Sequence, residues 1–287
     1  MSLYKSMISS VSPKVIIAVS LFFLLLPGKI YAQVTIRGKV MEEDSNPVPY
    51  ASIKLLKQTS GSVTDTAGNF SLRIASLKEN DTLLISSVGY ESLKTPVSKA
   101  LKNHEFTLKA NPRNLEAVVV RSFSKEDVAG AKIETVGFYR SWSTEKRGGE
   151  IGREIVVSHK EYQVAKVRFK IYSSCDTSII RLHIREFIDG RPGEELLKDS
   201  IAQTINNAAI ADKAYEFDLN KYNIILTNNN IFVSFEVLKG SRSDSTTCSF
   251  AFVGSEPGIY QYRSRWNDGW SSTNDYTIFM KVFFKYD

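Results

Sequence analysis

Residues 180–185 read Ile-Arg-Leu-His-Ile-Arg, so apolar side chains occupy every second position of this stretch. Successive side chains of a β-strand point to opposite faces of a sheet, and the alternation therefore predicts a strand with one apolar and one charged face. The same period of two appears over 167–171 (Val-Arg-Phe-Lys-Ile) and at alternate positions of 276–286. These three stretches favour an all-β second half of the chain.

Short apolar strands are also predicted in the first half, after an alternating segment over 34–40. Turn residues separate them at intervals of roughly 8 to 12 residues, a spacing typical of a β-sandwich. The predicted strands lie at 53–56, 70–74, 83–85, 106–108 and 117–120. In the whole chain, only the stretch around 193–200 has a composition that suits a short helix.

The first 32 residues have the features of an export signal. The apolar run 15–26 is shorter than the roughly 20 residues that a membrane-spanning helix needs, and it is followed by Pro27-Gly28 and by an expected cleavage site, Ile30-Tyr31-Ala32. We therefore expect a signal peptide over 1–32. Its three lysines supply half of the formal net charge of +6, so the remaining chain carries only +3 and its basicity does not indicate a nucleic-acid partner.

A polar stretch over 111–149 interrupts the strand pattern and suggests two folded units. We predict a first β-sandwich over 33–121, a linker over 122–130 and a second, larger β-sandwich over 131–287. The number of strand signals in the second unit favours a jelly-roll type of sandwich.

Five segments in the first unit carry a family resemblance. In chain order they are 36–40 (Ile-Arg-Gly-Lys-Val), 46–53 (Asn-Pro-Val-Pro-Tyr-Ala-Ser-Ile), 61–70 (Gly-Ser-Val-Thr-Asp-Thr-Ala-Gly-Asn-Phe), 85–90 (Ile-Ser-Ser-Val-Gly-Tyr) and 115–120 (Leu-Glu-Ala-Val-Val-Val). Together they resemble the carboxypeptidase-D-regulatory-like domain, a module that often extends the N-terminus of TonB-dependent outer-membrane receptors. The resemblance covers about residues 33–120. It implies a seven-stranded, transthyretin-like sandwich that serves for docking and has no peptidase activity.

Two residues depart from the family pattern and two fit simple turn chemistry. Tyr50 stands where the family usually has glycine, and Ala117 stands where it commonly has an acidic residue. Asp65 followed by Gly68 predicts a hairpin turn in which the carboxylate accepts backbone N–H groups and the glycine has a positive φ. Gly89 before a tyrosine indicates a strand kink.

The sequence singles out no catalytic or metal-binding residues and implies no cofactor. It contains no G-x-S-x-G elbow, P-loop or dinucleotide fingerprint. His183 and Glu186 have an H-x-x-E spacing, but positions three apart on a strand face opposite sides, and the other two histidines, His104 and His159, both precede them. We expect His183 to be a surface histidine on an outward strand face.

The two cysteines, Cys175 and Cys248, both lie in the second unit beside apolar strands. An exported chain with an even number of cysteines favours a disulfide between them, which would stabilise the fold by about 4 kcal/mol in the chain-entropy model. Two buried thiols in separate strands are the alternative.

Four aromatic residues form the candidate ligand site: Tyr260, Tyr262, Trp266 and Trp270. Asn267-Asp-Gly269 predicts a hairpin that would make the two indoles cross-strand neighbours. Core packing is the favoured interpretation of this cluster. A flat platform for sugar rings, flanked by arginines and amides, is the alternative.

We therefore expect an exported, non-catalytic binding or scaffolding protein in the periplasm, in the outer membrane or on the cell surface of a Gram-negative envelope. Its expected partners are envelope proteins or glycans, in association with the outer membrane, and not nucleic acid. The rival hypothesis is a glycan- or peptide-acting hydrolase whose carboxylates lie unmarked in 131–287, because such pairs are defined by geometry and not by spacing. The sequence leaves the ligand and the oligomeric state open.

Overall fold

The structure, a computed structural model, describes residues 34–56, 58, 60–78, 80–111, 123–133, 135–143, 148–206, 214–244, 246–265 and 268–287. Within these ranges the helices are short, namely α2 (Val97–Ala100) and the 3-10 helix η3 (Asn220–Tyr222), and strands make up most of the rest. The predicted all-β class is confirmed. The expected signal peptide lies outside the described residues, and none of the helices that are described is long and apolar enough to cross a membrane.

The first unit consists of two sheets packed around one apolar core. The three-stranded sheet has the order β4 (Asn69–Ile74), β1 (Val34–Glu42), β7 (Glu105–Leu108), with β1 and β7 parallel. The four-stranded sheet has the order β3 (Gly61–Val63), β2 (Ser52–Leu55), β5 (Thr82–Ser86), β6 (Leu93–Pro96) and is antiparallel. The buried positions of β4 and β5 alternate with exposed or half-buried ones, as a sheet with a single core face requires.

The turn between β3 and β4 has the predicted chemistry, but it connects strands of two different sheets and is not a hairpin. Asp65 Oδ1 accepts hydrogen bonds from the backbone N–H groups of Ala67 (2.9 Å) and Asn69 (2.8 Å), and Gly68 has φ +80°. A Cβ atom on Gly68 would lie 2.5 Å from the carbonyl oxygen of Val40, so both the conformation and the close approach require glycine here.

The second unit contains three sheets. The largest has the order β14 (Arg191–Glu195), β13 (Thr177–Ile188), β18 (Asn230–Ser241), β10 (Glu150–Val156), β20 (Tyr260–Arg263), β21 (Ser271–Thr273), with β15 (Ile201–Asn206) also paired to β13. The five-stranded sheet has the order β16 (Tyr215–Asp218), β11 (Tyr162–Phe169), β22 (Met280–Tyr286), β8 (Lys125–Gly130), with β17 (Ile224–Leu226) paired to β11. The third sheet has the order β12 (Ile171–Ser173), β19 (Ser249–Gly254), β9 (Thr135–Ser143).

Phenylalanine rings from all three sheets meet in the core of the second unit. The ring centroid of Phe169 on β11 lies 3.9 Å from that of Phe235 on β18, and Phe235 lies 6.0 Å from Phe252 on β19. All three side chains are buried. The described strands thus close around one core, while the jelly-roll topology stays a prediction.

Two local predictions differ from the structure. Residues 122–130 were expected to be a linker, but Lys125–Gly130 form β8, which pairs along its whole length with β22. The stretch 193–200 was expected to suit a helix, but its first part belongs to β14, which pairs with β13. The residues of β8 pair with a strand that is distant in the sequence, and those of β14 form a hairpin with the preceding strand β13. Local composition reveals neither pairing.

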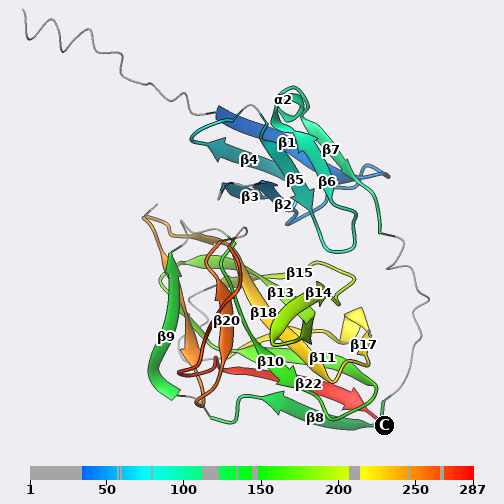
Figure 1. Ribbon diagram of the computed structural model, residues 1–287, viewed down its shortest axis with the longest axis vertical. Coiled ribbons are helices and arrows are strands. Elements are labelled where there is room, and N and C mark those ends of the chain that lie inside the picture. The colour runs from blue at the N-terminus through cyan, green and yellow to red at the C-terminus, as the bar shows by residue number, and fades with distance from the viewer. Residues whose placement is uncertain are drawn as a thin grey trace, which may run out of the picture.

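Figure 1 shows the smaller unit stacked on the larger one, with β2 and β3 on the side toward it. The largest sheet of the second unit is therefore covered on both faces in its centre. Strand β18 shows this directly, because eight consecutive residues, Ile231 to Leu238, are buried. One face of β18 packs on the core. On the other face, Phe232 packs against Phe187 and Trp270 of the same unit, and Glu236 lies near the contact with the first unit.

Candidate functional site

A row of charged residues crosses the outward face of the largest sheet. Arg181 on β13 pairs in register with Glu236 on β18, Glu236 with Glu150 on β10, and Glu150 with Arg263 on β20. Side chains opposite each other on one face of antiparallel strands lie about 5 Å apart. Two carboxylates thus stand side by side between two guanidinium groups. We call the four residues of this row, together with His183, Arg185 and Glu195, the charged cluster.

Arg181 connects the charged cluster to the first unit. Its Nε and Nη2 donate to Glu236 Oε2 at 2.9 and 2.7 Å. Its Nη1 donates to the backbone carbonyl of Tyr50, and its Nη2 to Ser52 Oγ, each at 2.7 Å. Arg181 is only 3% exposed and Glu236 1%. A buried ion pair in which each guanidinium nitrogen has a hydrogen-bond partner therefore lies at the contact between the two units.

His183 is held between two carboxylates. Its Nδ1 lies 2.6 Å from Glu195 Oε2, and its Nε2 lies 2.9 Å from Glu236 Oε2. Burial and the neighbouring Arg185 lower the pKa of the imidazole, but Glu150 and Glu195 outweigh them, so the pKa of His183 is raised. Both ring nitrogens face acceptors, as an imidazolium requires. The expectation of a surface histidine is wrong: His183 does point away from the core of its own unit, but the first unit covers it.

Glu150 is completely buried and accepts from three partners. Arg185 Nη1, Arg263 Nη2 and Ser234 Oγ all donate to its carboxylate. Burial alone would raise the pKa of Glu150, but Arg185, His183 and Arg263 lower it to about 2. Burial would likewise raise the pKa of Glu236, and Arg181 and His183 hold it well below its usual range. Both carboxylates are therefore ionised at neutral pH.

Raising the pH is expected to destabilise the folded chain through His183. Because the folded pKa lies above the ordinary value of 6.5, the stabilisation by the charged imidazole is fully present below pH 6.5 and is lost as the pH rises through the folded pKa. Urea unfolding between about pH 6 and pH 9 measures this loss. The replacement His183→Gln, which cannot ionise, is expected to abolish the dependence in that range. An identical pH profile in the variant would contradict the assignment.

A cavity of about 310 Å³ opens beside the charged cluster between the two units. The second unit contributes arginines, His183 and Glu195 to its wall, and the first unit contributes Lys54, Ser52 and the loop 86–90. Burial lowers the pKa of the Lys54 ammonium, and the nearby Arg263 lowers it further. The wall is therefore polar and rich in positive charge.

Gly89 fixes the contact of the loop 86–90 with the second unit. It has φ +88°, and a Cβ atom there would lie 2.6 Å from the carbonyl oxygen of Lys198. Gly89 lies in the turn between β5 and β6 and not within a strand, so the predicted strand kink is wrong. This turn is the point where the two backbones approach each other. A second cavity, of about 930 Å³, lies on the other side of this loop and is lined by residues of both units.

Three of the four aromatic residues predicted from the sequence lie on or beside β20 and β21, at one edge of the same sheet. Tyr260 is 3% exposed and belongs to the core, and Tyr262 packs against that core. Trp270 contacts the edge of Phe232, with centroids 5.1 Å apart, and the guanidinium groups of Arg263 and Arg185 lie 5.3 and 5.8 Å from its ring. Trp266 lies outside the described residues. These positions describe packing, so a ligand-binding role of the four aromatics stays a prediction.

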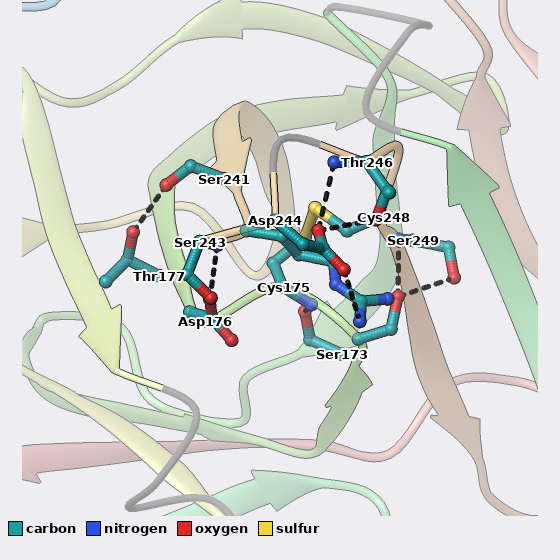
Figure 2. Close-up of a disulfide and its surroundings, with 12 residues drawn as sticks. Ser173, Cys175, Asp176, Thr177, Ser241, Ser243, Asp244, Thr246, Cys248 and Ser249 are labelled. Atoms are coloured by element: carbon teal, nitrogen blue, oxygen red, sulfur yellow. Dashed lines mark hydrogen bonds and ion pairs between the residues drawn. A yellow bond between two sulfur atoms is a disulfide. The ribbon is translucent and has the colours of Figure 1, made fainter.

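The predicted disulfide between Cys175 and Cys248 is present, with the two Cα atoms 5.1 Å apart. Figure 2 shows short polar side chains from both connected segments around it. Asp176 Oδ2 accepts from the backbone N–H of Ser243 at 2.6 Å, and the hydroxyls of Thr177 and Ser241 lie 2.6 Å apart. The bridge joins the segment before β13 to the segment before β19.

His183 and Glu186 do not form a metal site. His183 is engaged by Glu195 and Glu236, whereas Glu186 lies three positions further along the strand against Gly193. Across the part of the chain that the structure describes, no group of three His, Cys, Asp or Glu side chains is arranged to hold a metal ion.

Sequence reasoning missed the charged cluster. The available signal was the presence of a charged residue or histidine at each outward position of 180–185, together with Glu236 inside the apolar run 231–238. A lone glutamate in such a run requires a buried partner. The position of that partner on a neighbouring strand follows only from the pairing register of β13 and β18 in the structure.

The first unit matches a known family. The profile of the CarboxypepD_reg-like domain covers residues 36–120. Residues 36–120 belong to this domain family. The expected resemblance is therefore confirmed, and the match ends before the second unit.

Two curated relatives match this chain at similar levels of identity. TonB-dependent receptor P39 of Formosa agariphila is 32% identical over 114 residues, which are 39% of this chain and 11% of the relative. TonB-dependent receptor SusC of Bacteroides thetaiotaomicron is 31% identical over 102 residues, which are 34% of this chain and 10% of the relative. The chain thus matches about a tenth of the length of these receptors.

Among solved structures, the major pilin subunit BcpA of Bacillus cereus aligns with 86% of this chain and 69% of its own, at a TM-score of 0.21 and 10% identity. A likeness at that level carries no argument about fold or function.

One departure of this CarboxypepD_reg-like domain from its family has a structural role. Tyr50, at the usual glycine position, has φ +57°, a left-handed conformation that favours glycine. The carbonyl of the same residue accepts the hydrogen bond from Arg181. The unusual backbone conformation therefore lies at the contact with the second unit. Ala117, the other departure, lies outside the described residues.

Proposed function

We propose that this protein is an exported, non-catalytic binding or scaffolding protein of the Gram-negative outer membrane or cell surface. The observation that supports it is the CarboxypepD_reg-like domain over 36–120, in a segment shared with relatives named TonB-dependent receptors. In this chain the domain is docked to a second β unit through Arg181. We propose that the two units act together to hold an envelope protein or a glycan.

The chemistry of the charged cluster favours binding over hydrolysis. A glycoside hydrolase needs one carboxylic acid with a raised pKa to protonate the leaving group. Here the pKa values of Glu150 and Glu236 are both lowered, and arginine side chains donate hydrogen bonds to both carboxylates. The two glutamates are therefore suited to fixing arginines in place. The hydrolase hypothesis would require a different pair within 131–287.

The proposal is tested by affinity capture. A tagged chain beginning at Gln33 is incubated with detergent-solubilised outer membranes and, separately, with a glycan array. Saturable retention of a defined envelope protein or glycan, displaced by excess untagged protein, is the expected result. Turnover on a glycan or peptide panel that disappears when one acidic residue of 131–287 is replaced by its amide would overturn the non-catalytic assignment.

A further inference from the structure

We propose that the cavity between the two units binds a small oxyanion, a ligand that carries a carboxylate, sulfate or phosphate group, through Lys54 and Ser87 of the first unit. This site goes beyond the envelope-binding role proposed above, and either can fail without the other. The inference rests on the charge balance of the wall, on an unpaired lysine and on an unpaired hydroxyl.

The cavity wall carries more positive than negative charge. Its basic side chains are Lys54, Arg181, His183, Arg185 and Arg263, and its carboxylates are Glu195 and Glu236. Glu150 forms ion pairs with Arg185 and Arg263 and is a third carboxylate, although it does not itself line the cavity. Five positive groups against three negative ones leave a surplus of two with His183 charged, and of one with His183 neutral. An anion in the cavity would neutralise this surplus.

Lys54 is the basic group without a counterion. The carboxylates of the cluster are bound by Arg181, His183, Arg185 and Arg263, and no described carboxylate lies within ion-pair distance of the Lys54 ammonium. The side chain lies on β2, beside the Tyr50 and Ser52 contacts of Arg181, and reaches the cavity. A half-buried ammonium without a partner is unfavourable, as its lowered pKa indicates. An oxyanion would supply the missing partner.

Ser87 provides a second unused donor at the same wall. Its hydroxyl oxygen is buried and has no hydrogen-bond partner among the described residues. Buried polar groups are normally paired, and an unpaired one at a cavity suggests that a ligand or water completes it. Lys54 lies on β2, and Ser87 directly follows β5, the strand that pairs with β2. Together they offer one charged and one neutral donor to an oxyanion.

The size of the cavity restricts the ligand. About 310 Å³ lies at the lower end of the range of small-molecule sites. A free phosphate or sulfate fits this volume, and so does a single acidic sugar such as glucuronate. All three candidate ligands carry an oxyanion group, and titrations with each anion separately show which of them binds.

Isothermal titration calorimetry of the chain from Gln33 onward tests the site. Sodium glucuronate, sodium phosphate and sodium sulfate are titrated at low ionic strength, with glucose as the uncharged match to glucuronate. At least one anion is expected to bind with one-to-one stoichiometry, and glucose is expected not to bind. Lys54→Met should weaken that binding at least about tenfold, because it removes a charge-assisted hydrogen bond. Ser87→Ala should weaken it by a smaller factor.

The matched control is Lys94→Met on β6. Lys94 lies in the same cross-strand row as Lys54, because Leu84 on β5 pairs with both, but its side chain is exposed and does not line the cavity. This variant is expected to bind the anion as the parent does. Equal weakening by Lys54→Met and Lys94→Met would indicate diffuse surface attraction and overturn the site, as would binding of no anion or equal binding of glucose.

A second measurement excludes misfolding as the cause of lost binding. Methionine keeps the apolar stem of Lys54 packed and removes the unpaired charge, so the ligand-free Tm of Lys54→Met should equal or exceed that of the parent. The rise in Tm that the anion causes in the parent should be absent in the variant. A parent that binds envelope partners but no anion would refute this site alone, and anion binding without envelope partners would refute the proposed function alone.

Discussion

Arg181→Met is expected to lower the free energy of unfolding by about 3 to 5 kcal/mol, the usual effect of removing one partner of a buried ion pair. The variant leaves the Glu236 carboxylate buried without its arginine, although the contact with His183 remains, and it removes the hydrogen bonds to the Tyr50 carbonyl and to Ser52. The two units should therefore lose stability and also mutual contact. Differential scanning calorimetry should show one transition in the parent and two in the variant.

A surface ion pair offers the matched control for this variant. Arg168 pairs with Glu216 at the edge of β11, and its side chain is 39% exposed. Arg168→Met is expected to change the free energy of unfolding by less than about 1 kcal/mol. The double replacement Arg181→Met, Glu236→Leu should lose less stability than Arg181→Met alone, because no unpaired carboxylate remains. Equal losses in Arg168→Met and Arg181→Met would contradict the role given to Arg181.

Removing the disulfide with Cys175→Ala and Cys248→Ala is expected to lower the free energy of unfolding of the second unit by about 4 kcal/mol. The bridge closes a long loop, with a sequence separation of 73, and so restricts the unfolded chain. Urea unfolding of the double variant against the parent measures the loss. Reduction of the parent with dithiothreitol should reproduce it.

The first unit provides an internal control for the disulfide, because it contains no cysteine. Chemical shifts of amide groups in β1 to β7 should be unchanged in the double variant under native conditions. If reduction leaves the unfolding midpoint of the parent unchanged, the bridge contributes nothing in solution and the prediction is wrong.

Local sequence patterns predicted the elements that depend on neighbouring residues. The period of two over 180–185 identified β13, and Asp65 with Gly68 identified the turn between β3 and β4. The two cysteines predicted their own bridge because the chain offers a single pair. In each case the physical cause, namely pleat, turn geometry or covalent bonding, lies within the residues concerned.

The remaining features depend on contacts between distant segments. Strand β8 is polar and short, and it is recognisable only through its partner β22, which follows it by about 150 residues in the chain. The outward face of β13 was correctly predicted to be charged. Its burial depends on contact with the first unit, which no pattern in 180–185 indicates. The positions of Arg181 and His183 therefore came from the sequence, whereas their environment required the structure.

The pairing of β8 with β22 brings two distant parts of the second unit together. The backbone N–H of Ser124 donates to Asp287 Oδ1 at 3.1 Å, so the chain enters this unit beside the point where residue 287 lies. Chain ends that lie close together tolerate circular permutation. The geometry therefore permits β8 and β22 to be joined by a short linker and the chain to be reopened in a loop of this unit, with its contact to the first unit kept.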